Sequence, residues 1–507
     1  MYALKSKRLK PKHSPNEKIG ALTIVHKTKH SERATFFSFR RVAYIRFMSK
    51  SYKSALAMLV SVFFFWGFVA AGNTILIPVF KKSLELQQWQ AQLIEFCFYV
   101  AYAVGALAYY LIGRARGKDI LNTIGYKKGL IYGLLISAFG AFLFMPAASY
   151  ESFPLMLTGL FIVGLGFSLQ QTAANPLAIS LGSRETGSSR LSMAGGINNV
   201  GTTIAPILLS YAIFGSTGTA ENTVLSLESV KLPYLILCAA FIVVAAAIKF
   251  SKIPDQLADD YGTSDNERLR IANYPSLWMG MIGIFVYVGV EVSTAANLSE
   301  YLKIEAGISE DNVAPYISLF WGSLMIGRWA ASVGAFSVSR TMENVLRVIA
   351  PLLAFGLFLA ANSLKASTDI SIFYPYLIPM TVLLIAAHIT SNKPALQLQL
   401  FASLGIASLF IGMFTTGMLS IFGFISVGLF CSTLWPCVFD LATGGLGKFK
   451  SQGSAFLIMM IMGGGFISVF QGYLSDDSLL GIRHSYWVGV ACFAYLAYYG
   501  RYMMTRT

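Results

Sequence analysis

Residues Gly164 to Pro206 read GLGFSLQQTAANPLAISLGSRETGSSRLSMAGGINNVGTTIAP and set the pattern for the whole chain. Two apolar arms flank a short hydrophilic turn that carries Arg184, Glu185 and Arg190. Each arm also carries uncharged polar side chains, namely Gln170, Gln171 and Asn175 in the first and Asn198, Asn199, Thr202 and Thr203 in the second. Because amides in a lipid bilayer need hydrogen-bond partners or a water-filled cavity, the stretch predicts two membrane-spanning helices with a polar face.

The composition extends this interpretation to the rest of the chain. Of the 507 residues, 55% are hydrophobic and 12% are charged, and the mean hydropathy is +0.61. Soluble domains cannot bury so much apolar surface, and runs of about 20 apolar residues, the length that crosses a hydrocarbon core, recur along the chain. The sequence therefore predicts an all-α polytopic membrane protein. Its five cysteines lie inside these runs without metal-ligand spacing, so we expect buried apolar residues.

The net charge of +15 does not indicate nucleic-acid binding, because it is concentrated in the first 50 residues. This segment holds 13 lysines and arginines against Glu17 and Glu32. Three explanations compete: a basic arm near anionic lipid, an organellar transit peptide, or an upstream extension of the reading frame, with residues 1–47 untranslated. We favour the third explanation. Nothing in the segment could form a packed core, so residues 1–50 are predicted to be a disordered cytoplasmic tail.

Fourteen apolar runs are predicted as spans, six before and eight after a hydrophilic linker at 252–274. An N-terminal six-helix bundle at 51–251 and a C-terminal bundle at 275–507 would flank the cytoplasmic linker. The runs are 55–78, 90–112, 128–148, 153–181, 190–214 and 233–251, then 275–301, 312–335, 344–362, 373–390, 399–414, 416–440, 453–474 and 485–503. With both termini inside, the loops on the cytoplasmic side hold most of the loop lysines and arginines, as the positive-inside rule requires. The rule does not distinguish fourteen spans from twelve.

Several motifs resemble those of one transporter family. The first half carries WGFVAAGNTILIP (Trp66 to Pro78), QTAANP (Gln171 to Pro176) and SSRLSMAGGINNVGTTIAP (Ser188 to Pro206). The second half carries YVGVEVS (Tyr287 to Ser293), IGR (Ile326 to Arg328), WPCVF (Trp435 to Phe439) and QGSAFLIMMIMGGG (Gln452 to Gly465). Together they resemble the fucose and glucose/galactose permease family of the major facilitator superfamily.

The resemblance implies the major facilitator fold, with two six-helix bundles around a central substrate site and alternating access. Two departures from the family are apparent. The family has twelve spans, so the additional pair, at about 343–395, is predicted to be an inserted helical hairpin. The family also commonly has an Asp after the Asn of the first helix and a Glu before TAANP in the fourth, where this chain has Thr74 and Gln171.

A sugar site inside a membrane is expected to combine amides, aromatic rings and few charges. Amides four residues apart, such as Gln171 and Asn175, share one helical face. The predicted substrate-binding residues are Asn73, Gln171, Asn175, Asn198, Asn199, Tyr287, Trp321 and Trp435. The alternative is that these amides join neighbouring helices. We weigh the two roles about equally for a single amide and favour a cavity lining for the group.

Proton coupling requires a group within the membrane that changes its charge state. Glu291, in the middle of the seventh run, is the first candidate, because removal from water favours the protonated carboxyl group. Glu95 is the second, since it shares a helical face with two tyrosines. For Glu291 the alternative is a paired contact between helices. Asp440 and Arg328 are interpreted as structural residues, with Arg328 as the partner of an acid.

These features predict a secondary transporter for a fucose-, galactose- or glucose-like monosaccharide, working by proton symport in a bacterial inner membrane. We expect a monomer whose partners are the sugar and the lipid bilayer, with no nucleic acid, no cofactor, no metal and no enzymatic activity. The coupling ion would be a proton or sodium. Two alternatives stay open: an uncoupled or sodium-coupled carrier of another small polar solute, and a non-transporting membrane sensor.

Overall fold

The long apolar runs of the sequence form helices in the computed structural model of the protein. The structure describes residues 54–69, 83–84, 88–116, 120–214, 228–255, 270–308, 310–336, 338–363, 369–476 and 478–506. The tail predicted at residues 1–50 lies outside these ranges. Residues Ser54–Thr507 form one compact unit.

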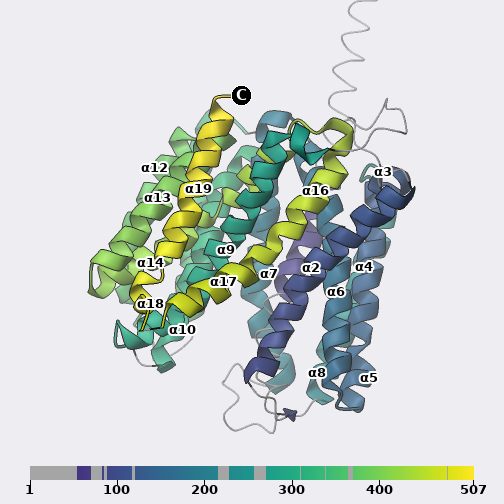
Figure 1. Ribbon diagram of the computed structural model, residues 1–507, viewed down its shortest axis with the longest axis horizontal. Coiled ribbons are helices and arrows are strands. Elements are labelled where there is room, and N and C mark those ends of the chain that lie inside the picture. The colour runs from purple at the N-terminus through teal and green to yellow at the C-terminus, as the bar shows by residue number, and fades with distance from the viewer. Residues whose placement is uncertain are drawn as a thin grey trace, which may run out of the picture. The chain divides into compact units, whose positions relative to one another are not determined.

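The helices before the linker form the first half of this unit (Figure 1). An apolar helix spans Ser54–Val69. It is followed by α2 (Gln88–Arg116), α3 (Ile120–Ile124), α4 (Tyr126–Phe142), α5 (Phe144–Ser149), α6 (Phe153–Ser180), η1 (Arg184–Thr186), α7 (Gly187–Phe214) and α8 (Glu228–Phe250). Residues Gly164 to Pro206 thus form the C-terminal part of α6, the turn η1 and most of α7.

The helices after the linker form the second half. They are η4 (Ile271–Asn273), α9 (Pro275–Ile304), α10 (Glu310–Ser332), η5 (Val333–Ala335), α11 (Arg340–Ser363), η6 (Ile370–Tyr376), α12 (Leu377–Ile389), α13 (Pro394–Phe414), α14 (Gly417–Cys431), α15 (Leu434–Thr443), η7 (Gly447–Phe449), α16 (Lys450–Met459), η8 (Met460–Met462), α17 (Gly463–Leu474), α18 (Gly481–His484) and α19 (Trp487–Met504). At the start of η6, hydrogen bonding to the Ser371 side chain and to the Ser371 N–H, the latter at 2.9 Å, lowers the pKa of Asp369.

Membrane-spanning character follows from the length and composition of these helices. Among the described residues, ten stretches are long and apolar enough to cross a bilayer, including Phe153–Ser180 and Pro275–Ile304. The helix Ser54–Val69 is a shorter apolar segment. The prediction of an all-helical polytopic membrane protein is therefore confirmed.

In the first half, α4 packs against α6 and α8, and α2 packs against α6 (Figure 1). Glycines bring α4 and α6 into backbone contact: a Cβ atom at Gly140 would lie 2.6 Å from the Val163 nitrogen and 2.7 Å from the Gly159 oxygen. Small residues permit this approach, which strengthens van der Waals packing where lipid supplies no hydrophobic driving force. Any larger side chain at Gly140 would push α4 away from α6.

The second half repeats this packing pattern. Here α13 packs against α14 and α19, and α10 packs against α14, so α10, α13, α14 and α19 correspond to α2, α4, α6 and α8. α11 lies against α10, and α12 contacts α10, α13 and α14. Arg347 of α11 bonds the Glu343 carboxylate at 2.7 Å and Ser391 Oγ, just after α12, at 2.8 Å.

One buried amide in the first half joins three helices. Gln170 of α6 is fully buried; its Oε1 accepts the Trp66 Nε1–H at 2.9 Å, and its Nε2 donates to Ser137 Oγ of α4 at 3.0 Å. Such bonds between membrane helices contribute about 0.6 to 2 kcal/mol each. For Gln170 the helix-joining role is the one that the structure shows.

The two halves are in contact at the end of the unit that carries the segments 181–186, 251–255, 333–336 and 444–449, which we call the linker end. A Cβ atom at Gly334 would lie 3.3 Å from the Ser189 Cβ, and one at Gly187 would lie 3.2 Å from Asp440 Oδ1. The ring of Tyr110 in α2 also lies 4.6 Å from that of Phe456 in α16. The contacts of α7 with η5 and α15 and of α2 with α16 therefore close the linker end.

Candidate functional site

A polar network in the interior begins on α9. Tyr287 and Glu291 lie one helical turn apart, and the Tyr287 hydroxyl donates to the Glu291 carboxylate. Tyr287 is 2% exposed, whereas Glu291 is partly buried. The structure thus places the predicted coupling acid beside a predicted substrate-binding residue.

Arg328 of α10 extends this network into the first half. Its Nη1 donates to Asn199 Oδ1 of α7 at 2.8 Å, its Nη2 lies 3.4 Å from the Tyr287 hydroxyl, and its Nε donates to the Ser432 carbonyl at 3.2 Å. Placing a guanidinium group within a membrane costs free energy unless such acceptors surround it. Glu291, Tyr287, Arg328 and Asn199 therefore form a continuous chain, which we call the central network. From the sequence, Arg328 was interpreted only as the structural partner of an acid. Its position as a charged residue inside an apolar run was the signal that could have indicated a functional role.

Two glycines of α7 leave room for this part of α10. A Cβ atom at Gly195 would lie 3.2 Å from Arg328 Cδ, and one at Gly196 would lie 3.0 Å from Trp329 Cδ1. Trp329 Nε1 donates to the Gly196 carbonyl at 3.4 Å. The side chains that these two glycines accommodate are those of Arg328 and Trp329 in α10.

The predicted aromatic residues differ in their distance from the network. The ring of Trp435 in α15 lies 6.3 Å from the Tyr287 ring and 5.9 Å from that of Phe439, and Trp435 is partly buried. Trp321 is 42% exposed and lies two turns before Arg328, hence on the same face of α10. Trp435 therefore borders the central network, whereas Trp321 lies further along the helix that carries Arg328.

The predicted amides of the first half have mostly local partners. Gln171 Nε2 donates to the Tyr102 hydroxyl of α2 at 2.9 Å, and Asn198 Nδ2 donates to the Phe63 carbonyl at 2.9 Å. Asn175 is 1% exposed, and its Nδ2 has no hydrogen-bond partner within the described ranges. Asn198 thus joins two helices, while Gln171 is partly buried beside a tyrosine.

Two further predicted residues cannot be placed. Asn73, like Thr74, lies outside the described residues. Glu95 lies within α2, but its side chain is outside what the structure describes. The prediction for Glu95 therefore stays a prediction. In the described part of the chain, no group of His, Cys, Asp and Glu could hold a metal ion, and four of the five cysteines are buried.

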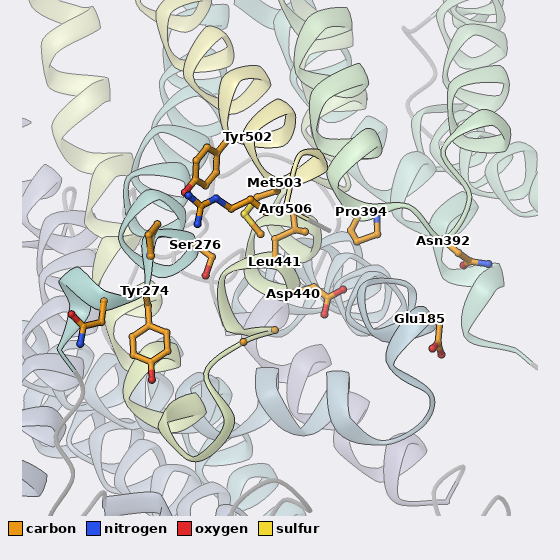
Figure 2. Close-up of a pocket in the computed structure, with 14 residues that line it drawn as sticks. Glu185, Tyr274, Ser276, Asn392, Pro394, Asp440, Leu441, Tyr502, Met503 and Arg506 are labelled. Atoms are coloured by element: carbon orange, nitrogen blue, oxygen red, sulfur yellow. The ribbon is translucent and has the colours of Figure 1, made fainter.

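A pocket of about 490 Å³ opens at the linker end, apart from the central network. Figure 2 shows side chains from both halves around it. Its lining includes Glu185, Tyr274, Asp440, Tyr502 and Arg506. None of the predicted substrate-binding residues lines this pocket. The pocket lies at the end of the unit where α7 contacts α10 and α15.

Apolar helices in two halves of repeated packing, with a charged network between the halves, define a polytopic secondary transporter. The sequence model described as Major Facilitator Superfamily matches residues 119–392. A glucose/galactose transporter of Brucella abortus is 34% identical over 453 residues, covering 89% of this chain and 94% of the relative. The chain therefore belongs to the major facilitator superfamily, within its group of glucose/galactose transporters and fucose symporters.

More distant relatives agree with this placement. The L-fucose-proton symporter of Escherichia coli is 26% identical, covering 92% of this chain and 96% of the relative. The crystal structure of the transporter FucP in the outward conformation superimposes with a TM-score of 0.69 at 25% identity, covering 89% of this chain and 99% of that one. The family resemblance predicted from the motifs is confirmed, and with it a transport protein rather than an enzyme.

Proposed function

We propose that this protein is a proton-coupled symporter for a fucose-, galactose- or glucose-like monosaccharide. Its relatives are named as glucose/galactose transporters and L-fucose-proton symporters. The observation that carries the proposal is the central network, because it combines an ionisable carboxyl group, a guanidinium group, an amide and the Tyr287 ring, with the Trp435 ring beside it. Hydrogen-bonding groups beside flat rings suit a polyhydroxylated ring.

Sugar binding is assigned to residues of both halves. Tyr287 and Trp435 supply adjacent rings in the second half. Gln171, with an amide that reaches Tyr102, supplies the corresponding polar surface in the first. Asn73, Asn175 and Trp321 stay in the predicted set, whereas the bond from Asn198 to the Phe63 carbonyl favours a helix-joining role for Asn198.

Proton coupling is assigned to Glu291, with Glu95 as the second candidate. Thr74 and Gln171 stand where the family commonly has acids, so the charge change must come from another residue. The Glu291 carboxylate accepts a hydrogen bond from the Tyr287 hydroxyl, and the Arg328 cation lies nearby. This environment couples gain or loss of its proton to rearrangement of the neighbouring side chains.

The finer architecture is also part of the proposal. Fourteen spans would cross the membrane, with bundles at 51–251 and 275–507 joined by the linker at 252–274. Support for an inserted pair at about 343–395 comes from the packing, since α11 and η6 with α12 have no counterpart in the pattern that relates the halves. A monomer in a bacterial inner membrane, with both termini cytoplasmic, completes this description. The linker end would then be cytoplasmic, and its contacts favour an outward-facing form.

The decisive experiment is uptake of labelled monosaccharides into proteoliposomes, with an imposed pH gradient compared against a sodium gradient. We expect at least one of fucose, galactose and glucose to accumulate under the pH gradient. Accumulation under the sodium gradient alone would identify sodium, and not the proton, as the coupling ion. No accumulation of any sugar under either gradient would contradict sugar symport.

The coupling residue is tested in the same assay with Glu291→Gln. This variant keeps the size of the side chain and removes its titration, so we expect accumulation under the pH gradient to be lost. The matched control is Glu300→Gln on the same helix, because Glu300 is 53% exposed and forms an ion pair with Lys303 at 3.4 Å. Uptake by Glu291→Gln with an unchanged pH dependence would remove Glu291 from the mechanism, and Glu95→Gln would then be measured.

A further inference from the structure

Arg328 is shared between two kinds of partner. On one side lies Asn199, a neutral amide that belongs to the other half of the protein, bonded at 2.8 Å. On the other side lies the Tyr287 hydroxyl at 3.4 Å, which is itself bonded to the Glu291 carboxylate. The shorter bond crosses between the halves, and the longer one stays within the second half. Movement of this one guanidinium group can therefore exchange a bond between halves for a bond within one half.

The charge of Glu291 decides which partner holds Arg328 more strongly. An ionised Glu291 attracts the guanidinium group towards α9, because opposite charges interact strongly where water is scarce. A protonated Glu291 offers no such attraction, so the Arg328 charge depends on the oxygens of Asn199 and Ser432. The titratable groups that face Glu291 are Tyr287 on its own helix, Arg328 on α10 and Cys431 on α14, and Cys431 in turn neighbours Cys492 of α19.

The bond to Asn199 also lies within a longer interface. From this bond towards the linker end, α7 stays in contact with α10 through Gly196 and Trp329, and with η5, which follows α10, through Ser189 and Gly334. Separation of the halves at the linker end requires the whole contact to open. The Arg328 bond is therefore placed where it can hold the linker end closed.

We propose that the Arg328–Asn199 hydrogen bond is a lock that keeps the protonated, sugar-free carrier from opening at the linker end, and that the sugar releases it by providing hydroxyl acceptors for Arg328. This inference rests on the proposed proton symport. Asn199 is then a positioning residue, which acts on the carrier through Arg328, in place of the direct sugar contact predicted from the sequence.

The lock prevents proton leak, which is one part of the selectivity that symport requires. With Glu291 ionised and no sugar bound, Arg328 turns to Glu291 and the empty carrier is free to reorient. With Glu291 protonated and no sugar bound, Arg328 holds Asn199 and the carrier stays closed, so no proton leaks through. With Glu291 protonated and sugar bound, the sugar hydroxyls replace Asn199 and both solutes move together.

The first test measures proton leak in proteoliposomes without sugar, using an internal pH-sensitive dye. Asn199→Ala removes the acceptor on α7, so we expect sugar-independent proton entry to rise about fivefold or more, a typical coupling between two sites. The control is Thr203→Val one turn away, whose hydroxyl bonds the backbone oxygen of residue 199 in its own helix. Leak by Asn199→Ala at the level of the parent protein would overturn the lock.

The second test measures closure of the linker end without transport. The Cβ positions of residues 189 and 334 lie 3.3 Å apart, close to disulfide spacing of about 3.8 Å. We therefore expect the double variant Ser189→Cys with Gly334→Cys to cross-link faster in mildly acidic than in mildly alkaline buffer. The oxidant is adjusted so that a free thiol is oxidised at the same rate in both buffers. Adding Glu291→Gln makes cross-linking fast in both buffers, and adding Asn199→Ala makes it slow in both. Each single-cysteine variant is the control.

The two tests separate the lock from the proposed function. If the parent protein accumulates no sugar but its cross-linking depends on pH and on Asn199, the lock stands and sugar symport fails. If the parent accumulates sugar but Asn199→Ala cross-links like the parent in both buffers, the lock is wrong and sugar symport stands.

Discussion

The polar interiors of the two halves differ in chemistry. Between α4, α6 and the first helix, Gln170 is fully buried and bonded at both ends of its amide to neutral groups of its own half. Between α9 and α10, Glu291 and Arg328 share the Tyr287 hydroxyl, and Arg328 reaches across to Asn199. A neutral amide bonded at both ends holds helices in one arrangement, whereas a charged group with competing acceptors has more than one satisfactory arrangement. The first region is suited to rigidity and the second to a conformational change.

Arg328→Ala provides the strongest test of this contrast. The change leaves Asn199, Tyr287 and the Ser432 carbonyl without their donor, and hydrogen bonds from charged groups contribute about 1.5 to 3 kcal/mol each. We expect the initial rate of proton-driven uptake to fall about 100-fold, a loss of about 2.7 kcal/mol. The exposed Arg501→Ala on α19 is the control. Uptake by Arg328→Ala within about twofold of the parent would place the conformational change outside the central network.

Tyr287→Phe should have a smaller effect, because it removes one hydroxyl and leaves both charged groups. We expect uptake to fall about tenfold and the pH dependence of sugar exchange to shift, since the hydroxyl links Glu291 to Arg328. The matched control is Tyr495→Phe, whose hydroxyl bonds the Met279 carbonyl of the same helix α9 at 2.8 Å. A parallel loss in both variants, with no shift in pH dependence, would indicate damage to packing instead.

Gln171→Leu tests whether the first half contributes to sugar binding. Loss of one hydrogen bond to the sugar corresponds to about 1 kcal/mol, so we expect KM for the sugar to rise about fivefold with a similar maximal rate. Initial rates over a range of sugar concentrations measure both quantities. An unchanged KM would assign Gln171 to the contact with Tyr102 alone.

Gln170→Ala should alter stability and leave transport nearly unchanged. The variant leaves the Trp66 N–H and the Ser137 hydroxyl without this partner, so we expect about 1 to 3 kcal/mol of destabilisation. Thermal unfolding in detergent measures the loss, and uptake per folded molecule should stay within about twofold. A large fall in uptake at unchanged melting temperature would show that the first half also takes part in the conformational change.

The spans could be predicted from the sequence because each one is a local property of about 20 residues. The apolar runs at 153–181 and 275–301 correspond to α6 at Phe153–Ser180 and α9 at Pro275–Ile304. Glu291 could likewise be singled out as a candidate, since a carboxyl group in the middle of an apolar run is conspicuous. These signals need no knowledge of which helices touch.

The link between Arg328 and Asn199 could not be predicted in this way. The two residues are 129 positions apart, and no pattern within α7 or α10 names the partner helix. The partners of the predicted amides were equally out of reach: Asn198 and Asn199 are adjacent, yet one bonds the Phe63 carbonyl and the other an arginine of the opposite half. Neighbouring side chains on a helix point about 100° apart, so their roles depend on tertiary packing.

The position of α10 has a consequence for the surrounding lipid. This helix touches α7 on one side and carries α11 on another, and α12 is attached to both α10 and α13. Any shift of the part of α10 that carries Arg328 must therefore also move α11 and α12, two further lipid-facing helices, through the bilayer. We expect viscous resistance of the membrane to limit the turnover of this protein, so that it works more slowly in membranes of ordered, saturated acyl chains than in fluid ones.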